Sequence, residues 1–258
     1  MALLTRSKFY FGVQIDSDNN ILDIDEGTGV ISVALAVKAY SPSEIAVALS
    51  SALNQAGSLT YTVTLNRTTR LLRITASGTF SIRRSSGPNS ASNIYSRLGF
   101  AGSGDLTGLM QYDGTAAIGY SYEPQFYLLD YVPLEHNVKS VKASINETGS
   151  GAVEVVRFGT KRYMECSMDF ITDQKFIGDE IWSSNTTGVA DALRFMGFAI
   201  EKAAIEFMPD RLDVANYSKL VLESTESDSQ GTGFRLIEML DYGAGIYRTG
   251  RLVFREVS

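Results

Sequence analysis

Apolar and polar residues alternate along much of this chain, and a period of two is typical of β-strands. In residues 9–15, for example, Phe, Phe, Val and Ile alternate with Tyr, Gly and Gln. Clusters of turn-forming residues separate successive runs of this kind. The pattern predicts strands at residues 9–15, 21–24, 30–37, 60–65, 72–76, 80–82, 138–145, 153–157, 162–171, 204–208, 219–223, 234–240 and 251–257.

Two hairpins follow from the spacing of these strands. Residues 60–65 and 72–76 are separated by a polar turn. Residues 153–157 and 162–171 are expected to pair around Phe158-Gly-Thr-Lys161 in the same way, because glycine favours tight turns.

One segment changes to the helical period. Ser41 is suited to be the N-cap of a helix over residues 41–56, with Pro42 in the first turn and Glu44 placed for a capping box. Gly57 is expected to end the helix in the left-handed conformation. One face of this helix carries Ile45, Ala48, Leu49, Ala52 and Leu53.

A second helical pattern covers residues 187–203, where Val189, Ala192, Leu193, Met196 and Ile200 share a face. We therefore expect an α+β, β-rich fold: antiparallel sheets or a sandwich, with one well-capped helix packed on a sheet in each half. A chain of 258 residues is long enough for two domains. The predicted domains are residues 1–125 and 126–258, although residues 1–15 could instead pair with strands of the second half.

Two segments are candidate assembly arms. Residues 101–122 are rich in glycine and indicate a long loop with weak strands, and residues 224–233 form a polar, partly acidic loop. Long loops in compact domains often carry a function. We expect residues 102–120 and 224–233 to contact neighbouring subunits.

The charge distribution disfavours nucleic acid as a partner. The net charge is −6; residues 1–130 contribute −1 and the remainder −5. Neither half has the basic excess that would neutralise phosphates, so no direct nucleic-acid binding is expected, although the adjacent Arg83 and Arg84 leave a local basic patch open. No run of about 18 apolar residues occurs, so no membrane contact is expected, and the first residues lack a signal-peptide pattern.

Reactive residues are scarce. Cys166, the one cysteine, lies in an alternating run and is expected to be buried in a strand. The one histidine, His136, is expected in a surface turn, which leaves hydrolytic triads and His-rich metal sites unsupported. The glycines of Gly243-Ala-Gly245 lie between two predicted strands and fit a hairpin loop better than a phosphate cradle. We predict a protein that is not an enzyme, with no catalytic, cofactor-binding or metal-binding residue and no cofactor.

An acidic segment leaves the metal question open. Asp16, Asp18, Asp23, Asp25 and Glu26 follow one another closely and could bind calcium. Their spacing does not fit an EF-hand loop, so a solvated acidic turn is the favoured interpretation.

Residues 20–100 carry a resemblance to a known class of proteins. The pattern includes Asn20-Ile-Leu-Asp-Ile-Asp-Glu-Gly27, Tyr40-Ser-Pro-Ser-Glu-Ile45, Tyr61-Thr-Val-Thr-Leu65 and Leu98-Gly-Phe100. It resembles a module of structural proteins in tailed bacteriophages and other viruses, in which a helix packs on a β-sheet. The resemblance implies a virion structural subunit of the tail, baseplate or adaptor type. Its expected partners are copies of itself in a ring-like homo-oligomer and other virion proteins, assembled in the host bacterial cytoplasm.

Three alternatives remain from the sequence. The first is a capsid-surface or neck protein of the same class. The second is a host-glycan-binding module, in which aromatic rings would stack on sugars. The third, least favoured, is a glycan-cleaving enzyme with paired carboxylates. The aromatic candidates are Tyr112, Tyr120, Tyr122, Tyr127 and Trp182, and the carboxylate candidates are Glu180, Asp191, Glu201, Glu206 and Asp210.

Overall fold

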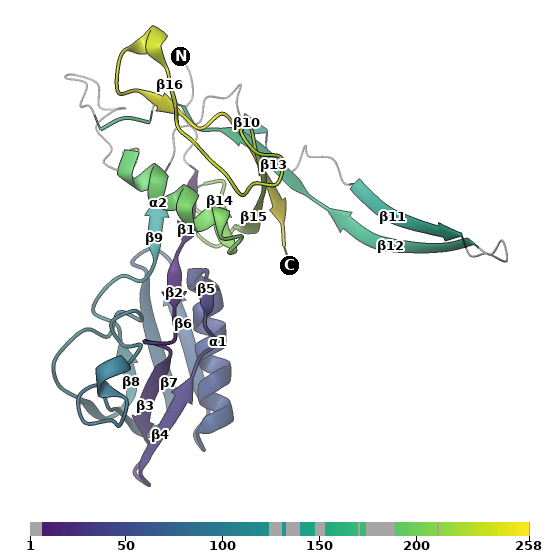
Figure 1. The fold of residues 1–258 in the computed structure, drawn as a ribbon. Coiled ribbons are helices and arrows are strands. Elements are labelled where there is room, and N and C mark those ends of the chain that lie inside the picture. The colour runs from purple at the N-terminus through teal and green to yellow at the C-terminus, as the bar shows by residue number, and fades with distance from the viewer. Residues whose placement is uncertain are drawn as a thin grey trace. The chain divides into compact units, whose positions relative to one another are not determined.

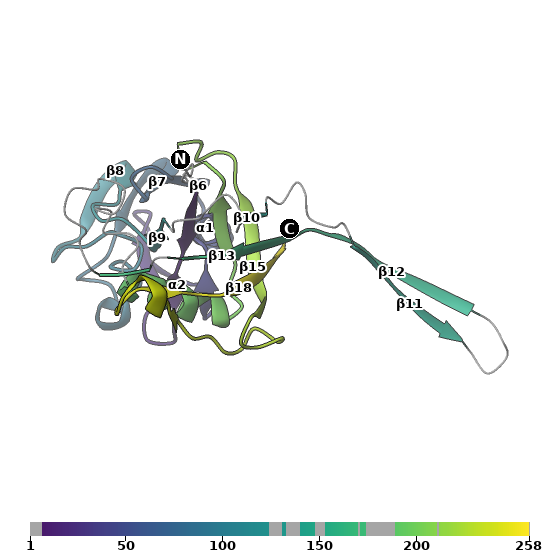
Figure 2. The same ribbon diagram turned by 90° about the horizontal axis from the view of Figure 1, so that it is seen from above.

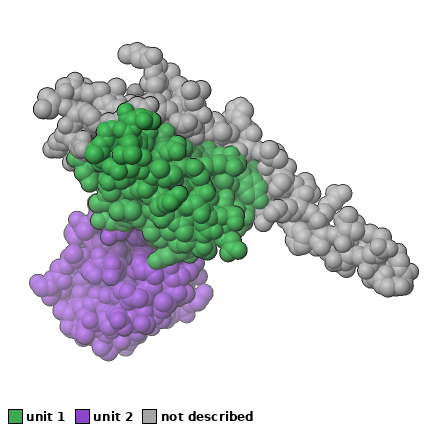
Figure 3. Space-filling model, turned by 45° about the horizontal axis from the view of Figure 1, so that its top comes forward, with its two compact units in different colours: residues 1–9, 122–258 green, residues 10–121 purple. Residues whose placement is uncertain are grey.

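A computed structural model gives the fold of the chain (Figure 1). It describes residues 7–123, 131–132, 140–147, 153–169, 171–173, 189–210 and 212–257. The chain divides into two compact units (Figure 3): the inserted unit, residues 10–121, and the split unit, residues 1–9 together with 122–258. Each unit has a sheet and a helix of its own.

The inserted unit is built around an antiparallel sheet in the order β4-β3-β7-β6, with β8 also paired to β7. The unit also has a two-stranded antiparallel sheet, in which β2 pairs with β5. The helix α1 (Pro42–Ala56) packs on this unit's strands, including β6 and β4 (Figure 1). The strands are β2 (Val13–Ile15), β3 (Ile21–Asp25), β4 (Val30–Ala34), β5 (Lys38–Tyr40), β6 (Tyr61–Asn66), β7 (Leu71–Ile82) and β8 (Leu106–Asp113).

The N-terminus of α1 forms as the sequence predicts. The Ser41 Oγ accepts a hydrogen bond from the Glu44 amide at 3.2 Å, and the Ser41 amide donates to Glu44 Oε2 at 3.1 Å. This reciprocal pair is the capping box, with Pro42 in the first turn. The prediction for the other end is wrong, because Gly57 has an extended conformation (φ −90°, ψ 169°) rather than a left-handed one. Its amide still donates to the Leu53 carbonyl at 2.8 Å, so the end is satisfied without a left-handed residue.

The core of the inserted unit joins α1 to the sheet. Three aromatic rings pack edge to face across neighbouring strands: Tyr61 on Phe80 at 5.3 Å and Phe80 on Tyr112 at 4.9 Å between centroids. The Leu98-Gly-Phe100 segment closes the core, since both apolar side chains are buried. A side chain at position 99 would be excluded, because Gly99 has φ +77° and a Cβ there would lie 2.1 Å from the Ala116 carbonyl oxygen.

The split unit is built on a seven-stranded sheet in the order β10-β13-β18-β15-β14-β1-β9. Part of it is seen from above in Figure 2, where β13, β15 and β18 lie side by side. The helix α2 (Val189–Ile200) packs against β15, and its Phe195 ring lies 4.7 Å from Phe9 and 5.3 Å from Tyr122. The strands are β1 (Lys8–Phe11), β9 (Tyr120–Tyr122), β10 (Tyr131–Val132), β13 (Tyr163–Ser167), β14 (Ile205–Met208), β15 (Ser218–Thr225) and β18 (Arg251–Glu256).

Two hairpins complete the described part of the split unit. β16 (Ile237–Glu238) pairs with β17 (Tyr247–Arg248), with the short helix η5 (Leu240–Tyr242) in the connection. The glycines at 243 and 245 therefore lie in a hairpin loop, as predicted. β11 (Ser140–Glu147) pairs with β12 (Val153–Lys161) as a separate two-stranded sheet (Figures 1 and 2).

The α+β, β-rich class with antiparallel sheets and two helices packed on strands is confirmed. The predicted hairpin of residues 153–157 and 162–171 is wrong, because β12 pairs with β11 and β13 pairs with β18. The physical reason lies at Phe158-Gly159, where two residues of β12 face one of β11. Gly159 therefore lies in a β-bulge and not in a tight turn.

Other boundaries also differ from the sequence pattern. The two strands expected at 72–76 and 80–82 are one strand, β7, which runs through Gly78. The segment 101–122, predicted to be a long loop with weak strands, contains the strands β8 and β9 with loops before and between them. The second helix is shorter than expected; its described part ends at Ile200, and Lys202 follows in a left-handed conformation (φ 58°).

Candidate functional site

The edge strand β8 is the most unusual surface of the inserted unit. Among the described residues it pairs on one side only, with β7. Residues 107–111 are all exposed, and Leu109 and Met110 expose 57% and 49% of their surface. No charged residue occurs from Leu106 to Tyr112. Because natural proteins usually protect an open edge with charges or proline, an uncharged apolar edge marks a candidate pairing site.

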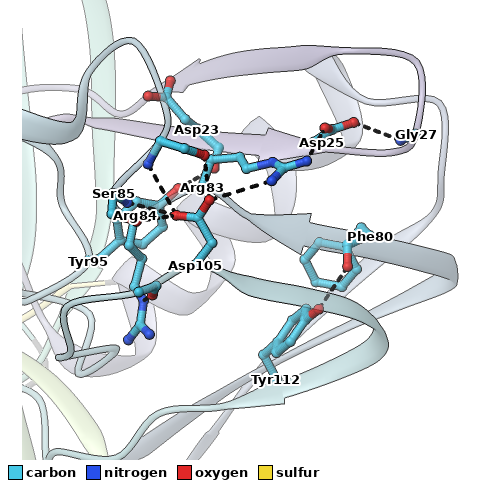
Figure 4. Close-up of polar contacts among 12 residues, drawn as sticks. Asp23, Asp25, Gly27, Phe80, Arg83, Arg84, Ser85, Tyr95, Asp105 and Tyr112 are labelled. Atoms are coloured by element: carbon cyan, nitrogen blue, oxygen red, sulfur yellow. Dashed lines mark hydrogen bonds and ion pairs between the residues drawn. The ribbon is translucent and has the colours of Figure 1, made fainter.

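Tyr112 holds β8 where its ladder with β7 is interrupted. The register shifts between Thr75 and Phe80 of β7. The Tyr112 hydroxyl bridges this gap: it donates to the Phe80 carbonyl at 2.8 Å (Figure 4) and accepts from the Leu109 amide at 3.0 Å. Gly108 precedes this point with φ +75°, a conformation that residues with a side chain rarely adopt. The exposed strand is therefore held in place by a buried tyrosine.

Asp105 anchors the start of β8 (Figure 4). Its Oδ1 accepts hydrogen bonds from the Ser85 amide and hydroxyl, both at 2.8 Å, and from the Ser86 amide at 3.2 Å. Its Oδ2 accepts from the Ser86 hydroxyl and pairs with Arg83 Nη1 at 3.5 Å. Burial alone would raise the pKa of this carboxyl, but together the hydroxyls and amides of Ser85 and Ser86 hold it well below its usual range.

Arg83 and Arg84 are used inside the same network (Figure 4). The Arg83 guanidinium lies between Asp105 and Asp25, with Nη2 2.6 Å from Asp25 Oδ2. The Arg84 guanidinium donates to the carbonyls of Phe100, Ala101 and Gly104 at 3.0, 2.8 and 2.7 Å. The basic pair therefore fixes the loop that leads into β8.

The remaining carboxylates of the acidic segment are also engaged by protein groups. Asp23 is fully buried; its carboxylate accepts from the Ser32 hydroxyl at 2.7 Å and from the amide and side chain of Asn89 at 2.7 and 2.9 Å. Asp25 has a lowered pKa, first because of Arg83 and then because of the Gly27 amide.

Glu26 accepts from the Ser58 amide and the Tyr61 hydroxyl, at 2.9 and 2.8 Å. Among the described residues, no group of three or more His, Cys, Asp or Glu side chains is arranged to hold a metal ion.

A second open element is the β11–β12 hairpin. Within the described ranges neither strand belongs to a larger sheet. The register places Ala143 opposite Arg157, Ile145 opposite Val155, and Glu147 opposite Val153. Each strand of the hairpin therefore has one paired edge and one outer edge without a described partner.

The predicted arm at residues 224–233 is a compact turn. The Asp228 carboxylate accepts from the amides of Gln230, Thr232 and Gly233 at 2.8, 2.8 and 2.7 Å and from the Thr232 hydroxyl. The Thr232 hydroxyl, followed by these amides, lowers the pKa of Asp228 to about 2. Lys202 Nζ donates to the Gln230 carbonyl at 2.8 Å, which ties the turn to the segment after α2. Its contact with neighbouring subunits stays a prediction.

The aromatic candidates are not gathered on one exposed surface. Tyr112 and Tyr122 are buried, and burial raises the pKa of the Tyr122 hydroxyl. Tyr120 is 46% exposed and lies 5.8 Å from the Phe11 ring. Tyr127 and Trp182 lie outside the described residues.

The carboxylate candidates are distributed over several elements. Asp191 pairs with Arg194 at 3.3 Å on α2, whereas Glu206 is buried in β14. Glu201 and Asp210 are exposed after α2 and β14. Glu180 lies outside the described residues, as does His136.

Cys166 is buried in β13, as expected, and burial raises the pKa of its thiol. A thiol in this environment stays protonated at neutral pH, so it is a packing residue.

No protein-family model and no curated protein sequence matches this chain. No helix among the described residues is long and apolar enough to cross a membrane. β8 lies within residues 102–120, the segment predicted to be an assembly arm with weak strands, and its contact with neighbouring subunits stays a prediction. The bounds of the strand were not predicted, because Gly108 interrupts the alternation. The signal that points to it is the uncharged run from Leu106 to Tyr112 between two aspartates.

Proposed function

We propose that this chain is a non-enzymatic structural subunit of a phage virion. Within the virion, we place it in the tail, as a tail-tip, baseplate or adaptor-ring component that assembles with copies of itself and with other virion proteins. The observation that carries the proposal is the uncharged β8 edge, which has no second partner strand among the described residues and which the buried Tyr112 holds in place. β8 follows directly on residues 20–100, which resemble a module of virion proteins. A strand presented in this way is suited to add to a sheet or strand of a neighbouring protein.

The inserted unit supports the same proposal. Its polar side chains are largely committed to holding loops: Asp23, Asp105 and Arg84 together fix the chain between β7 and β8. These hydrogen bonds fix the shape of an exposed surface, and a surface that is already ordered lowers the entropy cost of association.

Labelling of purified particles tests the proposal. An antibody raised against the purified chain should label intact particles in immunogold electron microscopy, with the gold at the tail. Label at the neck or head would replace the tail assignment with the neck or capsid-surface alternative. Particles that contain none of the chain by mass spectrometry would overturn the virion assignment.

A further inference from the structure

The β11–β12 hairpin has two outer edges without a partner strand in the described part of the chain. A two-stranded hairpin is marginally stable alone in water, because it satisfies only half of its backbone groups and buries little apolar surface. The unpaired backbone groups along its outer edges favour addition of another strand.

The two outer edges are not equivalent. In β12, two residues (Phe158 and Gly159) face one residue of β11, Lys142. Such a bulge bends the strand that contains it and blunts its edge. β12 also has the charged residues Glu154 and Arg157 in its middle. β11 has no charge from residue 143 to 146, so its edge is the better acceptor of a strand.

β8 matches β11 in length and in charge. Each strand has eight residues, and each has an uncharged centre: residues 106–112 in β8 and residues 143–146 in β11. We propose that β8 of one copy pairs with the outer edge of β11 of a neighbouring copy. The pairing would supply backbone hydrogen bonds to both open edges at once.

This contact joins two different surfaces, so it is heterologous: every copy gives one edge and receives another. Repetition of a heterologous contact generates a ring when the rotation closes and a filament when it does not. The inference rests on the proposed function, because it specifies how a subunit of a ring or tube would contact its neighbour.

Three lysine substitutions test the pairing in the full chain. Met110→Lys places a charge on the exposed β8 edge, and Ile145→Lys places one in the centre of β11. Val47→Lys is the matched control: Val47 is 71% exposed, on α1, away from both strands in sequence. The molar mass of each protein is measured by light scattering coupled to size exclusion across a 100-fold range of concentration.

Met110→Lys and Ile145→Lys should each weaken self-association at least tenfold, whereas Val47→Lys should behave as the wild type. An equimolar mixture of the two edge variants should form dimers and nothing larger, because only one intact β8 and one intact β11 can then meet. Circular dichroism checks that Met110→Lys folds. If Ile145→Lys disorders the hairpin, the mixture stays informative, since that variant needs only its intact β8.

Two results would overturn the inference. If the wild-type protein stays monomeric over the whole concentration range, β8 does not pair with β11 of another copy. If Met110→Lys and Ile145→Lys associate as tightly as the wild type, the contact between copies lies elsewhere. Neither result bears on the labelling of particles, so the pairing and the proposed function can fail independently.

Discussion

We expect the Asp105 carboxylate to make a large contribution to the free energy of unfolding of the inserted unit, because its side chain is only 13% exposed and accepts several hydrogen bonds. In Asp105→Asn, one side-chain oxygen can still accept from Ser85. The new amide group, however, would donate toward the Ser86 hydroxyl and the Arg83 guanidinium, which are donors themselves. A hydrogen bond to a charged group contributes about 1.5–3 kcal/mol, and a partly exposed ion pair such as Arg83–Asp105 contributes about 0.5–1 kcal/mol. The substitution should therefore lower the free energy of unfolding by about 2–4 kcal/mol at pH 7.

Acid should remove this difference. The pKa of Asp105 is lower in the folded protein than the value of about 3.9 expected in the unfolded chain. A group with a depressed folded-state pKa stabilises the protein above its unfolded pKa, and the contribution is lost as the pH falls through the folded pKa. The gap in stability between wild type and Asp105→Asn should be full from about pH 5 upward and should shrink below about pH 4.

Urea unfolding followed by circular dichroism at several pH values measures both effects. Hydrogen exchange of peptides from residues 83–113 reports the local opening at pH 7. Asp113→Asn is the matched control, because Asp113 also pairs with an arginine, Arg73, at 2.6 Å, but both side chains are about half exposed. The control should cost less than about 1 kcal/mol. Equal losses for the two variants, or a loss for Asp105→Asn that does not change with pH, would refute the reasoning.

Three further outcomes are expected. Tyr112→Phe removes two hydrogen bonds and should cost about 1–2 kcal/mol, with faster hydrogen exchange at the Leu109 amide; unchanged exchange there would contradict the role of the hydroxyl. Ser41→Ala should cost about 1 kcal/mol through the lost N-cap, seen as a lower urea midpoint, whereas Ser41→Asp should retain most of the stability. The Cys166 thiol should not react with a thiol reagent in the native protein and should react fully in denaturant; rapid native reaction would show that the site is accessible.

The features that the sequence predicted well depend on residues close together in the chain. The start of α1 is one case, since Ser41, Pro42 and Glu44 act within a single turn. The β6–β7 hairpin is another, because its turn residues follow directly on an alternating run.

The features that the sequence missed depend on distant partners. β8 is held by Tyr112 through a carbonyl 32 residues away, and its alternation is hidden by Gly108. The partner of β12 was misassigned because Phe158-Gly159 suits a bulge and a turn equally, and only the ladder with β11 decides between them. The Asp105 site likewise joins residues about 20 positions apart, and no local pattern marks such a contact.

The position of β1 has a consequence for synthesis of the protein on the ribosome. β1 lies beside β14 in the sheet of the split unit, and Ser7 donates to the carbonyl of Pro209, 202 residues later. At about 5–20 residues per second, translation takes roughly 10–40 s to reach that partner. The inserted unit is continuous in sequence and can fold during this interval. The aromatic partners of Phe9, which are Phe195 and Phe207, have not yet been synthesised at that time. A nascent chain from which the inserted unit has emerged, but not β14, should therefore present a folded inserted unit and an aromatic strand β1 whose β14 edge is open, and exposed apolar strands of this kind make folding intermediates prone to aggregation.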